Sequence, residues 1–245
     1  MKIEIFQDIQ NVQKSIMITG IIKNFLKETH SLGIINIYSD VCLYYNNLYY
    51  YYVLMETAER DMEQDLIIRC KYNQFYTEND LINVLCQLIL VLAEMQKHNI
   101  AHRDIKPQNI LIIQGRYKIS DFGSVIKLSN NDGNITQGIT GSELYMSPII
   151  FYGLRQNLQE IKHNVYKSDV FSLGYCILLA GCLNFDSLVQ IRELTDMNKI
   201  QNILIYFLSG RYSNDLISFI IKMIEVDENK RPDFLQLESI LIQKK

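Results

Sequence analysis

The sequence has no large excess of charge of either sign. Its 24 Lys and Arg residues are balanced by 27 Asp and Glu residues, which leaves a formal charge of −3. No basic block interrupts this balance, so the electrostatic footprint of a nucleic-acid-binding protein is missing and no nucleic-acid partner is expected. Hydrophobic residues make up 48% of the 245 positions, enough for one sizeable folded domain or two small ones. This composition excludes an intrinsically disordered chain.

Long hydrophobic runs are also missing. No stretch reaches the roughly 18 apolar residues of a membrane span, so no membrane partner is expected. Lys2, Glu4 and Asp8 interrupt the first positions, where a secretory signal would have its apolar segment. A cytoplasmic or nuclear location is therefore the default expectation.

The cysteines form no recognisable framework. The five of them are scattered and include no Cys-x-x-Cys pair: Cys42, Cys70, Cys86, Cys176 and Cys182. An odd number in a chain without a predicted signal indicates reduced thiols, which we expect to be small core residues. Proline and glycine are scarce as well, with 3 and 11 copies, so asparagine is expected to occupy some of the turns.

The hydrophobic period changes along the chain and predicts helices and strands first, then a mainly helical remainder. Residues 8–29 have helical spacing with Asp8 as N-cap, and Thr77 with Asp80 predicts a capping box at the start of a second long helix. The predicted elements are a helix over 8–29, a hairpin of strands 34–45 and 48–55 turning at Asn46-Asn47, a helix over 78–98, a hairpin of strands 110–113 and 117–120, and helices over 167–180, 214–225 and 234–242.

Two polar segments flank the second hairpin. Residues 102–109 read His-Arg-Asp-Ile-Lys-Pro-Gln-Asn, and Asp121-Phe122-Gly123 begins twelve residues after Asn109. The first segment resembles the catalytic loop of the eukaryotic protein kinase family, and the second resembles its magnesium-binding loop. The resemblance implies an α+β, two-lobed fold: a small, partly β lobe over 1–56 and a large, mainly helical lobe over 57–245. ATP and Mg²⁺ would be bound between them.

The resemblance gives the polar residues of both segments roles in phosphoryl transfer, which depends on charges held in place. Asp104 would accept the proton of the attacking hydroxyl, and Lys106 would neutralise charge on the phosphoryl group. Asn109 and Asp121 would hold Mg²⁺ through oxygen ligands. The alternative is that these residues only cap turns around a hairpin.

Residues 141–148, Gly-Ser-Glu-Leu-Tyr-Met-Ser-Pro, resemble the end of the family's activation segment. Ser142 stands where the family places the hydroxyl that bonds the catalytic Asp and Lys in enzymes acting on Ser or Thr, which favours a protein substrate with such an acceptor. Arg103 is of the type that receives an activation-loop phosphate, and Thr136 or Thr140 could carry it. The alternative is that Arg103 only packs the loop.

The stretch Val53-Leu54-Met55-Glu56-Thr57-Ala58 resembles the last strand of the small lobe and the hinge. Met55 would then be the gatekeeper, the backbone of Glu56 and Ala58 would bond adenine, Asp61 would reach the ribose, and Leu111 would lie under the adenine ring. Met55 and Leu111 could equally be ordinary core residues.

Three further positions have a counterpart in the family. Asp169 begins a segment that resembles the central buried helix, where the family's Asp ties down the catalytic loop. Arg231 matches a late Arg that pairs with a Glu, but the Glu position here is Ile149. We therefore expect a substitute acceptor or a looser activation segment, since an unpaired buried charge is costly. Gln108 stands where members that prefer basic substrates have an acid, so no strong demand for Arg near the acceptor is expected.

The front of the chain departs from the family pattern. No Gly-x-Gly-x-x-Gly occurs in the first 60 residues, and residues 19–25, where a Lys-pairing Glu is expected near Ile22, contain no acid. Lys2 is the candidate for the phosphate-binding lysine. Three interpretations follow: a Ser/Thr kinase with a truncated small lobe, a pseudokinase or scaffold, and a related fold acting on a small-molecule alcohol. The catalytic residues favour the first, and the missing Gly-rich loop favours the second.

Overall fold

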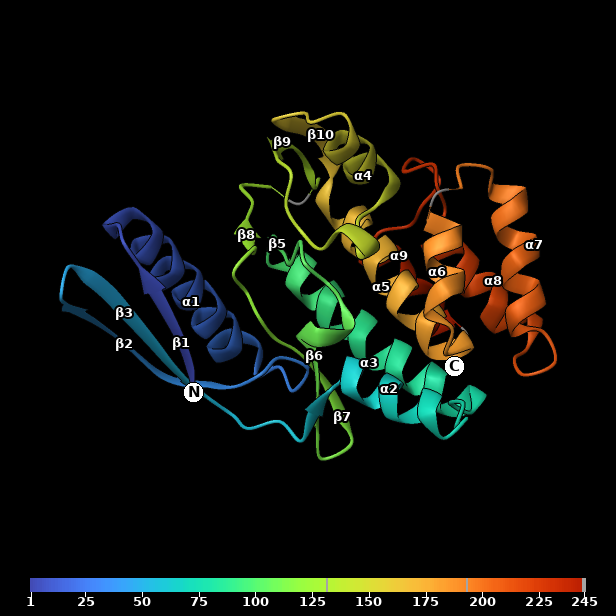
Figure 1. The fold of residues 1–245 in the computed structure, drawn as a ribbon, viewed down its shortest axis with the longest axis horizontal. Helices are drawn as coiled ribbons and strands as arrows, with labels where there is room; N and C mark the ends of the chain where they lie inside the picture. The colour runs from blue at the N-terminus through green and yellow to red at the C-terminus, as the bar shows by residue number, and fades with distance from the viewer. Residues whose placement is uncertain (131, 193, 244–245) are drawn as a thin grey trace.

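The computed structural model describes residues 1–130, 132–192 and 194–243 and has two lobes (Figure 1). The smaller lobe consists of β1 (Lys2–Phe6), α1 (Ile9–Thr29), β2 (Ile37–Tyr45) and β3 (Leu48–Met55). Everything that follows belongs to a larger, mainly helical lobe, and the predicted α+β fold with a small lobe of β-strands and one helix is confirmed.

The small lobe is a three-stranded antiparallel sheet with α1 packed on one face. The strand order is β1-β3-β2, and Lys2 stands opposite Val53 at the start of the β1–β3 pair. Val12 of α1 packs with Tyr51 and Val53 of β3 in a small core of its own. Because side chains alternate along a strand, Lys2 and Glu4 share the face turned toward this helix, while Ile3 and Ile5 are exposed.

The predicted first helix and first hairpin are confirmed. Asp8 caps α1 by accepting a hydrogen bond from the Asn11 N–H at 2.9 Å. Asn46 and Asn47 have φ of 48° and 60°, the positive values of a tight hairpin turn. The first strand begins three residues later than predicted, because Ile34 instead forms a parallel bridge with Ile119 of the larger lobe.

The large lobe begins with β4 (Arg60–Asp61) and ends with a helix near the last residue. Its further elements are α2 (Met62–Lys71), α3 (Glu78–Lys97), β5 (Ile100–Ala101), a 3₁₀ turn η1 (Pro107–Asn109), β6 (Ile110–Ile113), β7 (Arg116–Ile119), β8 (Ile126–Lys127), β9 (Asn134–Gly138), a 3₁₀ turn η2 (Glu143–Tyr145), α4 (Pro148–Arg155), β10 (Glu160–Asn164), α5 (Val165–Cys182), α6 (Phe185–Arg192), α7 (Met197–Leu208), α8 (Asn214–Met223) and α9 (Phe234–Gln243).

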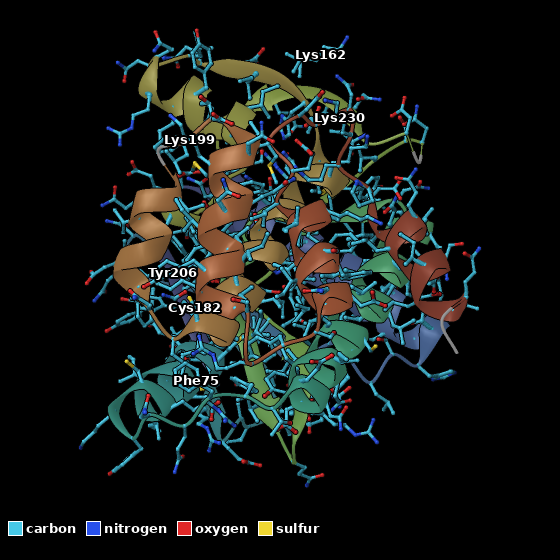
Figure 2. The ribbon with its side chains drawn as sticks, turned by 90° about the vertical axis from the view of Figure 1, so that its right-hand side faces the viewer. Phe75, Lys162, Cys182, Lys199, Tyr206 and Lys230 are labelled. Atoms are coloured by element: carbon cyan, nitrogen blue, oxygen red, sulfur yellow. The ribbon has the colours of Figure 1, made fainter. Side chains whose placement is uncertain are left out.

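The helix α5 runs through the centre of this lobe and is buried along nearly its whole length. A helix that is apolar on all sides is stable only when other elements surround it, and α3, α7, α8 and α9 pack around α5. On the outer side, α7 presents Tyr206 to solvent (Figure 2). No helix within the described ranges is both long and apolar enough to cross a membrane.

The long predicted helices of the large lobe are confirmed, and Thr77 and Asp80 form the predicted capping box of α3. In the second hairpin, β7 begins at Arg116, one residue before the predicted start, because the turn consists only of Gln114 and Gly115. The strand pair β9–β10 was not predicted; it is antiparallel, with Thr136 opposite Lys162.

No disulfide joins any of the five cysteines, all of which lie within the described residues. Cys176 and Cys182 are buried, as expected of small core residues, whereas Cys70 on α2 is exposed. The core interpretation is therefore wrong for Cys70, because an isolated cysteine on an amphipathic helix gives no sign of which face it occupies.

Candidate active site

Residues 102–109 form a loop between β5 and β6, and the start of α5 holds it in place. The Asp169 carboxylate accepts the backbone N–H groups of His102 and Arg103, each at 2.8 Å. Burial raises the pKa of Asp169 to about 7, against the two N–H bonds that favour the charged form. Arg103 has φ of 69°, a left-handed conformation that this double anchor maintains.

The His102 imidazole joins the loop to the segment before Asp121. It is fully buried; Nε2–H donates to the Ser120 carbonyl oxygen at 3.0 Å, and Nδ1 accepts from the Asp104 N–H at 3.3 Å. Burial lowers the pKa of His102, so the ring is neutral in the folded protein. The same ring packs edge-on against Phe122, 5.8 Å between centroids.

Asp104, Lys106 and Ser142 form a closed triangle of polar contacts. Lys106 Nζ lies 2.9 Å from Asp104 Oδ2 and donates to Ser142 Oγ at 2.8 Å, and Ser142 Oγ–H donates to Asp104 Oδ1 at 2.9 Å. Gly141 brings Ser142 into position: its φ is +111°, and a Cβ there would lie 2.9 Å from the Arg103 carbonyl oxygen. Only glycine fits at this close approach.

Asn109 and Asp121 extend this triangle toward the small lobe. Asn109 Nδ2 donates to the Asp104 carbonyl oxygen at 2.8 Å, and Asp121, two residues after the end of β7, has φ of 55°. Asp121 Oδ1 accepts from Lys2 Nζ at 2.9 Å. Burial would raise the pKa of Asp121, but the hydrogen bond and charge of Lys2 outweigh it and hold that pKa below its ordinary value.

Lys2 lies between two carboxylates. Besides Asp121, its ammonium contacts Glu4 Oε1 at 2.8 Å. Burial acts to lower the pKa of Lys2, but hydrogen bonds to Glu4 and Asp121 prevail and raise it. Lys2 lines a cavity between the lobes. The α1 residues that line this cavity are Ser15, Ile18 and Thr19, none of them acidic.

Ile22, the predicted position of a lysine-pairing acid, is fully buried in the core. Thr19, at the start of the same predicted stretch of residues 19–25, lines the cavity instead.

A cavity of about 290 Å³ separates the lobes at this point. Its walls include two of the predicted nucleotide-binding apolar residues, Met55 and Leu111, together with Lys2, Asn109 and Asp121. The predicted magnesium-binding residues Asn109 and Asp121 therefore lie on the wall of a cavity that combines apolar and polar side chains, the usual form of a small-molecule site, and Asp104 adjoins it through Asn109.

The remaining predicted nucleotide contacts lie beside this cavity but are not among the residues that line it. The Glu56 N–H donates to the Asn36 carbonyl oxygen at 3.0 Å, and its carboxylate contacts Lys118 Nζ at 2.7 and 2.9 Å. Asp61 caps α2 and pairs with Leu111 across β4–β6. Ala58 lies in the connection between β3 and β4.

The other residues predicted to act in the activation segment, Arg103, Thr136 and Thr140, are not part of the triangle of Asp104, Lys106 and Ser142. Arg103 Nη2 donates to the Gly138 carbonyl oxygen at 3.1 Å, and burial lowers the pKa of Arg103. Thr136 is exposed on β9, and Thr140 Oγ1 lies 3.3 Å from Ser124 Oγ. Reception of a phosphate by Arg103 stays a prediction.

Arg231 has the substitute acceptors that the sequence led us to expect. It is fully buried and donates to the carbonyl oxygens of Glu225, Lys167 and Val226 at 2.7, 3.0 and 3.2 Å. Its guanidinium also lies over the Phe171 ring, 4.8 Å from the centroid. Three backbone carbonyl oxygens thus take the place of the family's glutamate, whose position in this chain is Ile149.

Sequence reasoning missed two partners in the site, Glu4 and Lys118. The signal for Glu4 was available: residues two apart on a strand share a face, so a strand starting at Lys2 places Glu4 beside it. Lys118 pairs with Glu56 across the lobes, and nothing local in the sequence indicated that contact.

The small lobe has β-strands and one helix, and the large lobe is mainly helical. A lysine, an asparagine and two carboxylates line the cavity between them: Lys2, Asn109, Glu4 and Asp121. The family model described as "Protein kinase domain" matches residues 9–240. The chain belongs to the protein kinase family.

Similar proteins are serine/threonine kinases by name. The chain is 29% identical over 204 residues to the probable serine/threonine-protein kinase nek3 of Dictyostelium discoideum, covering 77% of this chain and 17% of that protein. It is 27% identical over 239 residues to the serine/threonine-protein kinase Nek2 of Mus musculus, covering 94% and 51%. With cds1 of Schizosaccharomyces pombe it shares 29% over 212 residues, covering 85% and 44%. The chain thus spans about half the length of these relatives or less.

Proposed function

We propose that this chain is a working serine/threonine protein kinase domain that transfers the γ-phosphoryl group of ATP to a Ser or Thr hydroxyl of a protein. The observation that carries the proposal is the triangle of Asp104, Lys106 and Ser142. Asn109 links this triangle to the cavity: its Nδ2 donates to Asp104 Oδ2 at 3.2 Å, and Asn109 lines the cavity together with Lys2 and Asp121, a link that turn capping alone would not require. The names of the relatives agree with this substrate class.

Asp104 supplies the base of the reaction. The substrate oxygen attacks the γ-phosphorus, the bond to the bridging oxygen breaks, and the hydroxyl proton passes to the Asp104 carboxylate while ADP leaves. Lys106, 2.9 Å from Asp104, holds a fixed positive charge beside the transferring group. Ser142 orients both side chains.

The residues present fit a magnesium ion. Asn109 and Asp121 both line the cavity and offer oxygen donors, and Mg²⁺ in phosphate-binding sites needs only one or two protein ligands besides phosphate and water. When bound with the nucleotide, Mg²⁺ would neutralise charge on its phosphates. Lys2 would contribute a second positive charge to the phosphates.

The adenine would lie between Met55 and Leu111. Since the Glu56 N–H already bonds Asn36, the Glu56 carbonyl oxygen and the backbone of Ala58 are the groups left to recognise its edge. Asp61, paired with Leu111 across β4–β6, would reach the ribose.

A scaffold that keeps the fold without catalysis is the second candidate. It is favoured by one observation, the absence of a Gly-rich phosphate loop from the first 60 residues. In that case, the cavity binds ATP weakly or not at all.

One experiment separates the two candidates. A fluorescent ATP analogue is titrated with and without Mg²⁺, and phosphate transfer to a mixed protein substrate is followed in parallel. We expect Mg²⁺-dependent binding that Asp121→Asn weakens, together with transfer. Binding without transfer would indicate a nucleotide-dependent scaffold. The absence of both binding and transfer would rule out the enzyme.

A further inference from the structure

The lysine that binds nucleotide phosphates in a kinase must be held by a carboxylate, which α1 does not provide. The only acidic residue between Ile9 and Thr29 is Glu28. Its side chain is 64% exposed, at the end of the helix and 4.0 Å from His98. The helix presents Ser15 and Thr19 to the cavity instead.

Glu4 provides a carboxylate to Lys2 from the strand β1. It lies two residues after Lys2 on β1, on the same strand face, and its Oε1 is 2.8 Å from Lys2 Nζ. Its side chain is only 24% exposed and lines the cavity with Ser15 and Thr19. Glu4 also stands directly opposite Tyr51 in the β1–β3 pair, so the sheet fixes its backbone.

We propose that Glu4 is the positioning residue of Lys2, and that this strand-borne pair replaces the pair between strand and helix, so that Lys2 is held in place whatever the position of α1. The proposal rests on the proposed function, since it concerns the phosphate-binding role of Lys2.

The two carboxylates act on Lys2 in opposite directions. Asp121 draws the ammonium toward the large lobe, and Glu4 holds it at the small lobe. Without Glu4, the nearest anionic partner is Asp121, so Lys2 would compete with Mg²⁺ for that carboxylate. With Glu4, the ammonium has a second acceptor and stays available to phosphate.

The matched test uses Glu4→Gln and, as control, Glu28→Gln, the one acid of α1. Glu4→Gln should lower kcat/KM for ATP roughly 10- to 100-fold, as expected for a misplaced positioning group, with the KM for ATP raised and the melting temperature within a few degrees of wild type. Glu28→Gln should leave kinetics unchanged. Equal kinetics for wild type and Glu4→Gln would overturn the proposal.

A rescue variant separates positioning from a structural role. Ser15 lines the same cavity from α1 and is half-buried, so Ser15→Glu in the Glu4→Gln background supplies a carboxylate from the helix. We expect at least tenfold of the lost kcat/KM to return. A structural defect at β1 would not be repaired from the helix, and failure of the rescue with an intact fold would count against the proposal.

A readout that needs no catalysis keeps this proposal apart from the proposed function. Competitive labelling with acetic anhydride, followed by mass spectrometry of the peptide containing Lys2, reports the pKa of that amine. The pKa should fall in Glu4→Gln and stay unchanged in Glu28→Gln. If wild type transfers no phosphate but the Lys2 pKa falls, the proposed function fails while the ion pair stands; if transfer occurs and the Lys2 pKa does not move, the role of Glu4 is refuted.

Discussion

At the scale of single residues, the site depends on which groups carry charge. Its anchor, Asp169, and its organiser, His102, are both buried, and burial disfavours the charged form of each. Asp121 keeps its charge because it contacts Lys2, and Lys2 keeps its charge because it contacts both Glu4 and Asp121. The two buried groups thus hold the loop in position, whereas Lys2 and Asp121 line the cavity where phosphate would bind.

His102 gives a pH-dependent prediction. Its folded-state pKa lies below the ordinary value of 6.5, so below that pH the unfolded chain takes up a proton that the folded protein does not. The contribution of this group is complete above pH 6.5, and the free energy of unfolding should fall by up to about 1.4 kcal/mol per pH unit below it. The NMR titration midpoint of the His102 ring should therefore lie below 6.5. A midpoint near 6.5 would contradict a buried neutral ring.

Arg231 gives a stability prediction. Arg231→Lys loses the planar fork that reaches three carbonyl oxygens, and buried acceptors without partners are costly. We expect a loss of roughly 2–4 kcal/mol in urea denaturation. Lys230→Ala, next to it and with its side chain 73% exposed, is the control and should change stability by less than about 0.5 kcal/mol. Equal effects of the two changes would show that the carbonyl contacts of Arg231 contribute nothing.

Sequence reasoning at this scale succeeded where a motif has fixed spacing and failed where a partner is distant. Two short segments with eleven residues in total contain all four predicted catalytic and magnesium-binding residues: Asp104, Lys106, Asn109 and Asp121. Gln108 shows the limit: its amide donates to Glu63 at 2.6 Å, so an acid lies beside a position where the local sequence has none.

At the scale of elements, the activation segment is held by a strand pair. Residues Asn134 to Gly138 of β9 pair with β10, which leads into α5. Arg103 adds a bond to the Gly138 carbonyl oxygen at the end of that strand. These contacts order the segment next to Ser142 through backbone hydrogen bonds.

Phosphorylation of this segment is a testable addition. If a phosphate on Thr136 or Thr140 is received by Arg103, the double variant Thr136→Ala/Thr140→Ala should lower the transfer rate, roughly tenfold for the loss of one or more charge-assisted bonds. Ser129→Ala, outside β9, is the control. The measurement is the initial rate after preincubation with ATP, and unchanged turnover of the double variant would refute the idea.

The elements that the sequence predicted are those with long, regular hydrophobic periods. The helices α1 and α3 also carry N-caps that define their first residues. In contrast, β9 and β10 have five residues each and mix polar with apolar side chains, so their pairing depends on tertiary contacts. The short α2 and α4 were missed for a similar reason.

At the scale of the whole molecule, the lobes are joined through main-chain and side-chain contacts next to the cavity. The Ile35 N–H donates to the Ile119 carbonyl oxygen at 3.0 Å, and the Ile119 N–H donates to the Gly33 carbonyl oxygen at 2.8 Å. Lys118 and Glu56 add an ion pair whose side chains are 7% and 13% exposed. The cavity walls are therefore fixed relative to each other on one side.

A double-mutant cycle tests this ion pair. Lys118→Met leaves a largely buried carboxylate without its cation and should lower the free energy of unfolding by roughly 3–5 kcal/mol. Adding Glu56→Gln should recover part of that loss, with a coupling energy of at least about 1 kcal/mol by urea denaturation. Lys162→Met, exposed on β10 and visible at one end of the lobe in Figure 2, is the control and should be near neutral. Strict additivity would mean that the pair does not join the lobes.

The most direct test of the account is a single-turnover phosphotransfer measurement on wild type and Asp104→Asn, at nucleotide concentrations that give equal occupancy of the two proteins. The account predicts that wild type phosphorylates Ser or Thr, identified by phosphoamino-acid analysis, and that Asp104→Asn binds nucleotide as well but transfers roughly 10²- to 10⁴-fold more slowly. Equal transfer by the two proteins, or transfer by neither, would contradict it.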